Sequence, residues 1–373
     1  MQDFIEKELS VLKASGLYRS LKTIEKTDGR TVTINGKTCL NFCSNNYLGL
    51  ANHPRVLAAA KSAIDEYGAG SGASRLISGN LVLHEKLEQK IAEFKKREAA
   101  IVFPTGYMAN LGVISALTDE KDTILIDRLD HASIIDACKL SRAKLQVFPH
   151  RDMKALEKIL GKSQNFGKRL IVTDSVFSMD GDLAPLPEIL ELAKKYRSLV
   201  MIDEAHATGV LGKTGRGLEE YFNCEGRTDI VMGTLSKAIG SLGGFVAGPK
   251  NLIDYLRNKS RSFIYTTALP PAACTAALAA LELIEKDTSL LDKLRMNLRP
   301  FSSLVPIIPI ILGSAEKAVE ISQEFFARGI LLSAIRPPTV PPGQSRLRLT
   351  ICSQHTKEDI ACLASLLQEL IPA

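Results

Sequence analysis

The feature that most constrains the fold is a regular alternation, between residues 52 and 261, of short apolar runs with segments of helical periodicity. The apolar runs are AAIVF, TILID, RLIVTD, SLVMID, DIVMG and GGFVAG. One helical segment places Leu83, Leu87, Ile91 and Phe94 three or four residues apart. Runs that are apolar throughout indicate strands buried on both faces. Their alternation with helices predicts an α/β fold with a mostly parallel central sheet and helices on both faces.

Two further regions flank this part of the chain, so we expect three parts: an arm at 1–51, a large domain at 52–271 and a smaller domain at 272–373. The arm begins as an amphipathic helix, and Asp28-Gly29 and Asn35-Gly36 then predict short hairpins. The last part combines helical segments with strand-like runs, PIIPIIL, GILLSAI and SRLRLTI, which is typical of an α+β domain. Its final helix is predicted to start with a capping box from Thr356 to Asp359.

Composition excludes several classes of partner. Forty-seven Lys and Arg stand against 41 Asp and Glu, a formal net charge of +6, and no block of like charges suggests nucleic acid. The apolar stretch Val305–Leu312 contains two prolines and is far shorter than the roughly 20 residues that a bilayer requires, so no membrane segment is expected. The start, MQDFIEKEL, is acidic where signal and transit peptides are not.

The cysteines point to a reducing compartment. There are seven, an odd number at scattered positions, and none shows the paired spacing of a zinc site. We therefore expect reduced thiols, no metal site and a cytoplasmic protein.

In such a sheet, ligands bind beyond the carboxyl ends of the strands, so polar residues that follow apolar runs are candidates for a site. After AAIVF, a turn at Gly106-Tyr107 leads into a helix whose amides and dipole favour a phosphate. After TILID comes His131, at the start of a helix. Taken alone, the turn is as well explained as a plain connection, and a lone histidine at this position is more often a helix cap or a surface residue.

Three more strand ends carry polar groups. Ser178 lies in a polar loop after RLIVTD, where a loop bonding its own backbone would look the same. Asp203 ends an apparently buried strand, and a buried acid requires a cationic partner. Lys237 follows DIVMGTLS and precedes Gly240, Gly243 and Gly244, a setting in which something approaches the backbone closely. An isolated lysine is otherwise most often a solvated surface charge.

A helicase-like interpretation of Asp203–His206 (DEAH) and Gly212–Thr214 (GKT) is rejected. A phosphate loop requires a glycine five residues before the one in GKT, and that position is Ala207. The GKT also follows the acidic motif, whereas a phosphate loop precedes it.

The combination of these residues is more specific than any one of them. An acid ends one strand, a lysine follows the next, and a phosphate-type turn lies upstream. Pyridoxal phosphate requires this set: an amine for its aldehyde, a carboxylate for its pyridine nitrogen, and amides and hydroxyls for its phosphate.

Nearly the whole chain resembles the α-oxoamine synthases, a family of fold-type I pyridoxal-phosphate enzymes. The motifs that carry the resemblance are SNNYLGL at 44–50, GSGASRLISG at 70–79, TGYMAN, LDHASI, VFSMDGD, IDEAHATGVLGKTGRG, GTLSKAIGSLGG, YTTALPP at 265–271 and IRPPTVPPGQSRLRLT at 335–350. The stretch 300–313 looks shorter than in the family.

The resemblance implies a role for individual residues. Lys237 would hold the cofactor as a Schiff base and act as the catalytic base, Asp203 would pair with the pyridine nitrogen, and His131 would stack on the ring and contact substrate. His206 and Ser178 would approach the phenolic oxygen. The phosphate would be bound by these groups: the Gly106-Tyr107 backbone, Thr234, Ser236, and Thr267 of the partner subunit of a homodimer.

The resemblance also implies a substrate. Arg348 and Asn45 would bind an amino-acid carboxylate, and Arg19 and Thr339 would lie near an acyl group, although neighbouring registers are possible at Arg19. Alternation in Arg346–Thr350 puts Arg348 on a polar strand face, as a plain solvent-exposed face also would. The segment Ile335–Pro341 matches members that condense L-alanine with a pimeloyl thioester, carried on coenzyme A or on an acyl carrier protein. A glycine-using synthase, an aminotransferase and a non-catalytic protein of the same fold remain alternatives.

Overall fold

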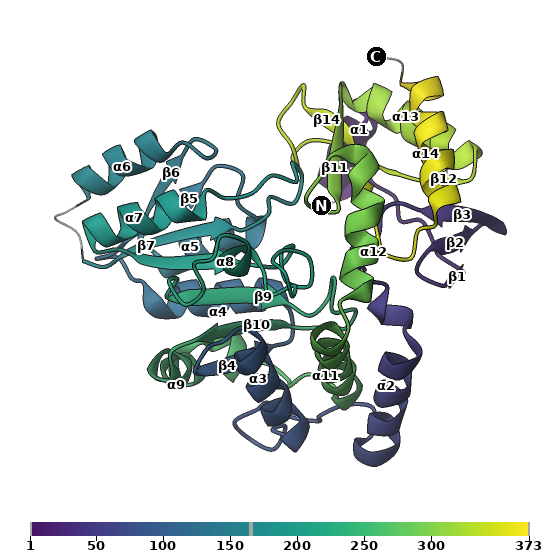
Figure 1. Cartoon of the computed structure of the whole chain (residues 1–373). Helices are drawn as coiled ribbons and strands as arrows, with labels where there is room; N and C mark the ends of the chain where they lie inside the picture. The colour runs from purple at the N-terminus through teal and green to yellow at the C-terminus, as the bar shows by residue number, and fades with distance from the viewer. Residues whose placement is uncertain (1, 164–166, 372–373) are drawn as a thin grey trace. The chain divides into compact units, whose positions relative to one another are not determined.

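The computed structural model describes residues 2–163 and 167–371, which fall into two units (Figure 1). The large unit comprises residues 48–178 and 182–292. The small unit comprises the described residues up to 47, a loop tip at 179–181, and those from 293 onward. Helix α12 (Ser289–Leu298) contains the boundary at residue 292.

The large unit is built on a seven-stranded sheet with the order β4-β10-β9-β8-β7-β5-β6. All neighbours are parallel except β10, which is antiparallel to β4 and β9. The strands are β4 (Ala99–Phe103), β5 (Thr123–Asp127), β6 (Lys144–Phe148), β7 (Arg169–Asp174), β8 (Leu199–Asp203), β9 (Ile230–Thr234) and β10 (Gly244–Gly248). The expected mostly parallel sheet is confirmed, and each of the six predicted apolar runs coincides with a strand.

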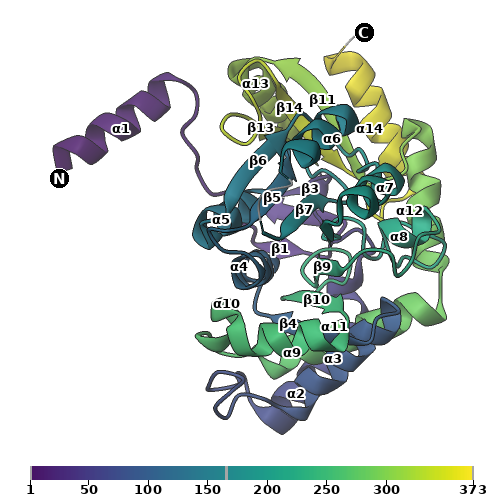
Figure 2. The same ribbon diagram turned by 90° about the vertical axis from the view of Figure 1, so that its left-hand side faces the viewer.

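Helices cover both faces of this sheet because its central strands are apolar on both sides. On one face α4 (Gly106–Leu117), α5 (Ala132–Ser141), α9 (Lys250–Lys259) and α10 (Arg261–Ile264) share a core with alternate strand residues. Figure 2 shows α4 and α5 side by side. The remaining elements of the unit are η1 (Leu50–Asn52), α2 (Pro54–Tyr67), α3 (Val82–Phe94), α6 (Met153–Lys162), α7 (Leu186–Tyr196), α8 (Leu218–Tyr221) and α11 (Pro271–Lys286).

The small unit contains two sheets. In the first, β1 (Lys26–Thr27), β2 (Thr31–Ile34) and β3 (Lys37–Asn41) are antiparallel, and β12 (Ile330–Leu331) joins β3 in parallel. In the second, β14 (Ser345–Thr350) lies between β11 (Ile307–Gly313) and β13 (Ser333–Ile335). Helices α1 (Gln2–Ala14), α13 (Ala315–Ala327) and α14 (Lys357–Leu370) and the 3-10 helix η2 (Arg299–Phe301) complete it.

Local signals and long-range pairing determine different parts of this unit. The Asn35-Gly36 turn has positive φ at both residues and joins β2 to β3, as predicted. The capping box between Thr356 and Asp359 is also present. The division into three parts differs, however. The β3–β12 pairing groups the arm with the C-terminal residues, and α11, expected in the C-terminal domain, belongs to the large unit.

Candidate active site

A cavity of about 170 Å³ lies in the large unit, at the carboxyl ends of the parallel strands and beside the N-terminus of α4. Polar strand ends meet here because parallel strands end at the same edge of a sheet. The residues that line the cavity are Gly106, Tyr107, Asn110, His131, Ser133, Asp174, Ser178, Asp203, Ala205, His206, Met232, Thr234 and Lys237. The structure thus brings together eight of the residues expected at a cofactor site.

Lys237 lies in a turn between β9 and β10. Its Nζ is 2.8 Å from Nε2 of His206. A charged ammonium only donates, so Nε2 of His206 is the acceptor when Lys237 is protonated. At Gly240, which has φ 70°, an added Cβ would lie 2.3 Å from the backbone N of Ala51. The group that approaches the glycine-rich turn closely, as the sequence predicts, is here the backbone of this same chain.

Asp203 ends β8 and is 4% exposed. Its Oδ1 accepts from the amide of Ala205 at 2.9 Å, and its Oδ2 accepts from the side-chain amide of Asn110 at 2.8 Å. Its backbone carbonyl accepts from both the N–H and the hydroxyl of Ser175. Two bonds leave further lone pairs on this carboxylate for a donor in the cavity.

His131 caps α5 and is connected to Asp203 through two side chains. Asn110 donates to Ser133 Oγ at 2.9 Å, and Ser133 Oγ lies 2.8 Å from Nδ1 of His131. Nδ1 also accepts from the Ser133 amide, so the proton of the neutral ring is assigned to Nε2. Desolvation lowers the pKa of His131, and the charge of Lys237 acts in the same direction, whereas Asp203 opposes both. The cavity therefore favours the neutral imidazole.

The N-terminus of α4 provides backbone donors at the cavity. Thr105 caps the helix by accepting from Met108, while the first amides of a helix have no carbonyl partner within it. Residue 244, at the start of β10, must be glycine, because a Cβ there would lie 2.5 Å from the carbonyl oxygen of Thr105. The Thr234 hydroxyl donates to Gly243 at 2.8 Å on the same side. This arrangement is suited to an anion.

Several lining residues were missed in the sequence, chiefly Asn110, Ser133 and Asp174. Asn110 lies one helical turn after Gly106, on the same face, and the strand-end argument used for Asp203 applies equally to Asp174. Burial raises the pKa of Asp174 well above its usual value, and the charges of Asp203 and Asp130 add to the effect. Asp174 and Asp203 are paired in register on β7 and β8 but have different hydrogen-bond partners, since Asp174 accepts from the His131 amide and Asp203 accepts from Asn110 and the Ala205 amide.

Two residues expected at the phosphate lie outside the lining of this cavity. Ser236 accepts from the Gly243 amide at 3.2 Å. Thr267 is exposed in the segment between α10 and α11.

In the small unit, Arg348 lies in the middle of β14 and is 7% exposed, so β14 is not a plain solvent-exposed face. Its guanidinium donates to Oδ1 of Asn45 at 3.1 Å and to the hydroxyl of Thr350 at 3.0 Å. Asn45 Oδ1 also accepts from the hydroxyl of Tyr47. The structure therefore brings together the two residues expected to bind a carboxylate.

The other two expected substrate residues are on the surface of the small unit. Arg19 is exposed and donates to the carbonyl of Pro337 at 3.2 Å. Thr339 is exposed two residues further along, and its amide bonds Arg336. The structure brings the segments of these two residues close to each other.

The cavity of the large unit fits pyridoxal phosphate. It combines one amine, a buried carboxylate with free lone pairs, an imidazole face and a helix N-terminus, which are the partners of the aldehyde, the pyridine nitrogen, the ring and the phosphate. Oδ1 of Asn110 is buried without a hydrogen-bond partner among residues 2–163 and 167–371. An orphaned acceptor at the cavity wall is expected where a ligand completes the site.

Comparison with known proteins agrees with this fit. The model of the aminotransferase class I and II family matches residues 37–367. The 8-amino-7-oxononanoate synthase of Thermoanaerobacter pseudethanolicus is 47% identical, covering 96% of this chain and 94% of that protein. The synthase of Citrifermentans bemidjiense is 48% identical, covering 99% and 98%.

Solved structures share the fold. A serine palmitoyltransferase from S. paucimobilis superposes with a TM-score of 0.93 at 32% identity, covering 99% of this chain and 96% of that one. An 8-amino-7-oxononanoate synthase from Francisella tularensis gives 0.77 at 31%, covering 89% and 97%. Another structure of the palmitoyltransferase contains pyridoxal phosphate as an internal aldimine. The chain therefore belongs to the aminotransferase class I and II family of pyridoxal-phosphate enzymes and, within it, to the 8-amino-7-oxononanoate synthases.

Proposed function

We propose that this enzyme condenses L-alanine with a pimeloyl thioester, a step of biotin biosynthesis. A carbon–carbon bond forms between Cα of alanine and the acyl carbon, and the thiol leaves. The carboxyl group departs as carbon dioxide, and the product is 8-amino-7-oxononanoate. The observation that carries the proposal is the 44–49% identity, over almost the whole chain, to proteins of that name.

Fold alone does not select the substrates, because a serine palmitoyltransferase superposes better than the Francisella synthase. The choice of alanine and a pimeloyl group therefore rests on sequence similarity, including the segment Ile335–Pro341. The carrier of the acyl group is either coenzyme A or an acyl carrier protein.

When bound, pyridoxal phosphate supplies an aldehyde for an amine and a protonated ring that withdraws electrons from Cα of the substrate. Lys237 provides the amine that anchors the cofactor, and its Nζ is the base that takes the α-proton of alanine. Asp203, held by Asn110 and the Ala205 amide, keeps a negative charge at the ring nitrogen.

The other lining residues orient the cofactor. His131, fixed by Ser133, stacks on the ring and faces the substrate. His206 and Ser178, which also line the cavity, would contact the phenolic oxygen of the cofactor. The amides of Gly106 and Tyr107 bind the phosphate together with Thr234 and Ser236. We assign a further phosphate contact to Thr267 of the partner subunit of a homodimer, since Thr267 is exposed.

Substrate recognition is assigned to the small unit. Arg348, oriented by Asn45 and Thr350, binds the carboxylate of alanine through two parallel N–H bonds. Arg19 and Thr339 contact the acyl chain. Their segments are near each other, which supports a shared role.

We also propose that the enzyme works in the cytoplasm. All seven cysteines lie in the described part of the chain and are free thiols there, as expected in a reducing compartment. None of the helices in that part is long and apolar enough to cross a membrane.

The test is a steady-state assay of the purified enzyme with pimeloyl thioesters and alanine, glycine or serine, in which thiol and carbon dioxide are both measured. Alanine should give the highest kcat/KM, with one thiol and one carbon dioxide per product. Preference for glycine would favour a glycine-using synthase, and pyruvate without carbon dioxide would indicate an aminotransferase. A preparation that binds no cofactor would indicate a non-catalytic protein.

A further inference from the structure

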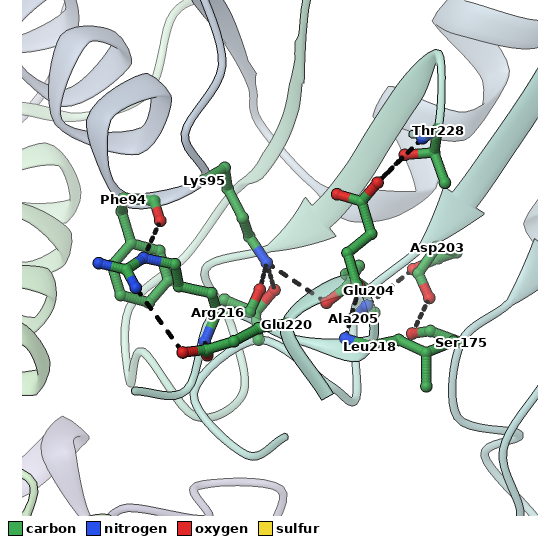
Figure 3. Close-up of polar contacts among 12 residues, drawn as sticks. Phe94, Lys95, Ser175, Asp203, Glu204, Ala205, Arg216, Leu218, Glu220 and Thr228 are labelled. Carbon is green, nitrogen blue, oxygen red and sulfur yellow. Dashed lines mark hydrogen bonds and ion pairs between the residues drawn. The ribbon is translucent and has the colours of Figure 1, made fainter. Parts of the chain in front are cut away.

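Glu204, the second residue of the DEAH sequence, has no place in the chemistry proposed above. It follows Asp203 directly, and neighbouring residues at a strand end point to opposite sides. Asp203 faces the cofactor cavity, whereas Glu204 lies between Asp203 and Lys95 in Figure 3. Glu204 is 1% exposed. A carboxylate in this position requires a partner.

Backbone and side chain together bind the Glu204 carboxylate. Its Oε1 accepts from the amide of Leu218 at 2.8 Å, and its Oε2 lies 3.3 Å from Nζ of Lys95 (Figure 3). Gly217, at φ 119°, makes room for it, because a Cβ there would lie 1.5 Å from Oε2. The local backbone is therefore shaped around this carboxylate.

Lys95 holds the loop after β8 at two points. Besides Glu204, its Nζ donates to the hydroxyl of Thr208 at 2.8 Å and to the carbonyl of Arg216. Glu204 and Thr208 flank His206, two residues away on each side, and His206 contacts Lys237. All three protons of the ammonium have acceptors, so its geometry is defined.

The contacts of Lys95 with Glu204, Thr208 and the Arg216 carbonyl form a clamp whose ion pair is buried. The side chains of Lys95 and Glu204 are 3% and 1% exposed. Burial lowers the pKa of Lys95, opposed by the charges of Glu204 and Glu219 and assisted by Arg97. Burial also raises the pKa of Glu204, opposed mainly by Lys95. Each charge of the pair is thus maintained chiefly by the other.

A neighbouring ion pair shows what a purely structural contact looks like here. Arg97, two residues after Lys95, donates to Glu219 at 2.6 Å, with side chains 7% and 9% exposed. Both residues also bond Thr228. Thr228 precedes β9, at the end of that strand opposite to Lys237. The Arg97 pair is as buried as the Lys95 pair but bonds no residue of the loop that carries His206.

We propose that Lys95 is a positioning residue of the cofactor site: by bonding Glu204 and Thr208 it fixes the loop from Asp203 to His206, and so the contact of His206 with Lys237. This inference rests on the cofactor site proposed above and is independent of the substrates. Lys95 touches neither the cofactor cavity nor Lys237.

The test compares cofactor binding by Lys95→Met, by Lys95→Met with Glu204→Gln, by the milder Thr208→Val, and by the wild type. The measurements are the dissociation constant of pyridoxal phosphate and the pH midpoint of its visible absorption on Lys237, without substrate. We expect Lys95→Met to weaken cofactor binding about tenfold and to move the midpoint by about half a pH unit. Thr208→Val should change both in the same direction by less.

The double variant separates positioning from stability. Removing both charges relieves the unpaired carboxylate and should restore much of the lost Tm. The clamp remains absent, so cofactor binding and the midpoint should stay altered. The matched control, Arg97→Met with Glu219→Gln, should lower Tm and leave both readouts unchanged.

Two results would overturn the proposal. One is a double variant that binds the cofactor within about twofold of the wild type, with an unchanged midpoint, because the pair would then be structural only. The other is an equal effect in the Arg97 control. If Lys95→Met does not fold, the double variant and Thr208→Val are compared with the wild type and with the Arg97 control instead. A wild-type protein without a Lys237-linked absorption band would instead contradict the cofactor site itself.

Discussion

The large unit and the small unit place their functional side chains in different ways. In the large unit, Lys237, Asp203 and His131 follow the ends of parallel strands and converge on one cavity. In the small unit, Arg348 lies in the middle of an antiparallel strand and is oriented by Asn45 and Thr350. The groups proposed to perform the chemistry are thus concentrated in the large unit, and the group proposed for substrate binding is in the small one. Substitutions in the large unit should lower kcat, and those at Arg348 should raise KM.

The largest effect is expected for Lys237→Ala. The variant loses both the amine that anchors the cofactor and the proposed base, so kcat should fall by roughly a thousandfold or more, while the cofactor still binds without a covalent bond. Steady-state kinetics and borohydride reduction followed by peptide mapping measure the two effects. The exposed Lys213 provides the control, as Lys213→Ala should leave both unchanged. Cofactor fixed to a peptide without Lys237 would contradict the assignment.

The next effect compares two neighbouring acids of the large unit. Asp203→Asn removes the charge at the ring nitrogen and should lower kcat about a hundredfold. Asp174→Asn should cost about tenfold or less, because burial already favours the neutral form of Asp174 and an amide oxygen still accepts from the His131 amide. Both are measured as kcat with saturating alanine. Equal losses would contradict the assignment of Asp203, and not Asp174, to the ring nitrogen.

At Arg348 the effect should appear in KM. Arg348→Lys keeps the charge and loses the planar pair of N–H donors, so KM for alanine should rise about tenfold while kcat changes less. The control is Arg346→Lys on the same strand. Arg346 already forms an ion pair with Asp180 at 2.7 Å, so this substitution should leave KM for alanine unchanged. A fall in kcat with an unchanged KM in Arg348→Lys would contradict the proposed division of roles, in which the large unit performs the chemistry and the small unit binds the substrate.

The smallest effect concerns stability near the Ser178 loop. His150 lies between Asp127 and Asp182, at 2.9 and 2.8 Å, and packs edge-on against Phe177. Partial burial by itself lowers the pKa of His150, but the two carboxylates raise it to about 9. The folded pKa is thus above the unfolded one of about 6.5, so this stabilisation is complete below that pH and is lost as the pH rises through 9.

His150→Gln should therefore lower the free energy of unfolding by about 1 kcal/mol at pH 6, after allowance for solvent screening, and by less at pH 10. Urea unfolding at the two pH values measures the difference. A loss that grows with pH would mean that His150 is neutral in the folded protein.

Much of the large unit was predictable because its signals are local. Six apolar runs predicted six strands. The seventh strand, β6 (Lys144–Phe148), was missed because it lies at the edge of the sheet and is mostly exposed or half-buried, so its sequence is not a continuous apolar run. Lys237, Asp203 and His131 were predicted as site residues because Asp203 ends a predicted strand and the other two come a few residues after one. Asn110 was missed, since a polar residue inside a helix looks the same in sequence whether or not it bonds an acid.

The sequence by itself determined the α/β class and the family, and it predicted the polar strand ends that line the cavity, since these depend on periodicity and on motifs within a few residues. Only the tertiary structure decided that the arm pairs with β12, that Arg348 is buried beside Asn45, and that Lys95 bonds Glu204 from 109 residues away. The physical reason is that burial and hydrogen-bond partners depend on which distant segments pack together. A lysine at the end of a helix carries no local sign of the carboxylate that it meets.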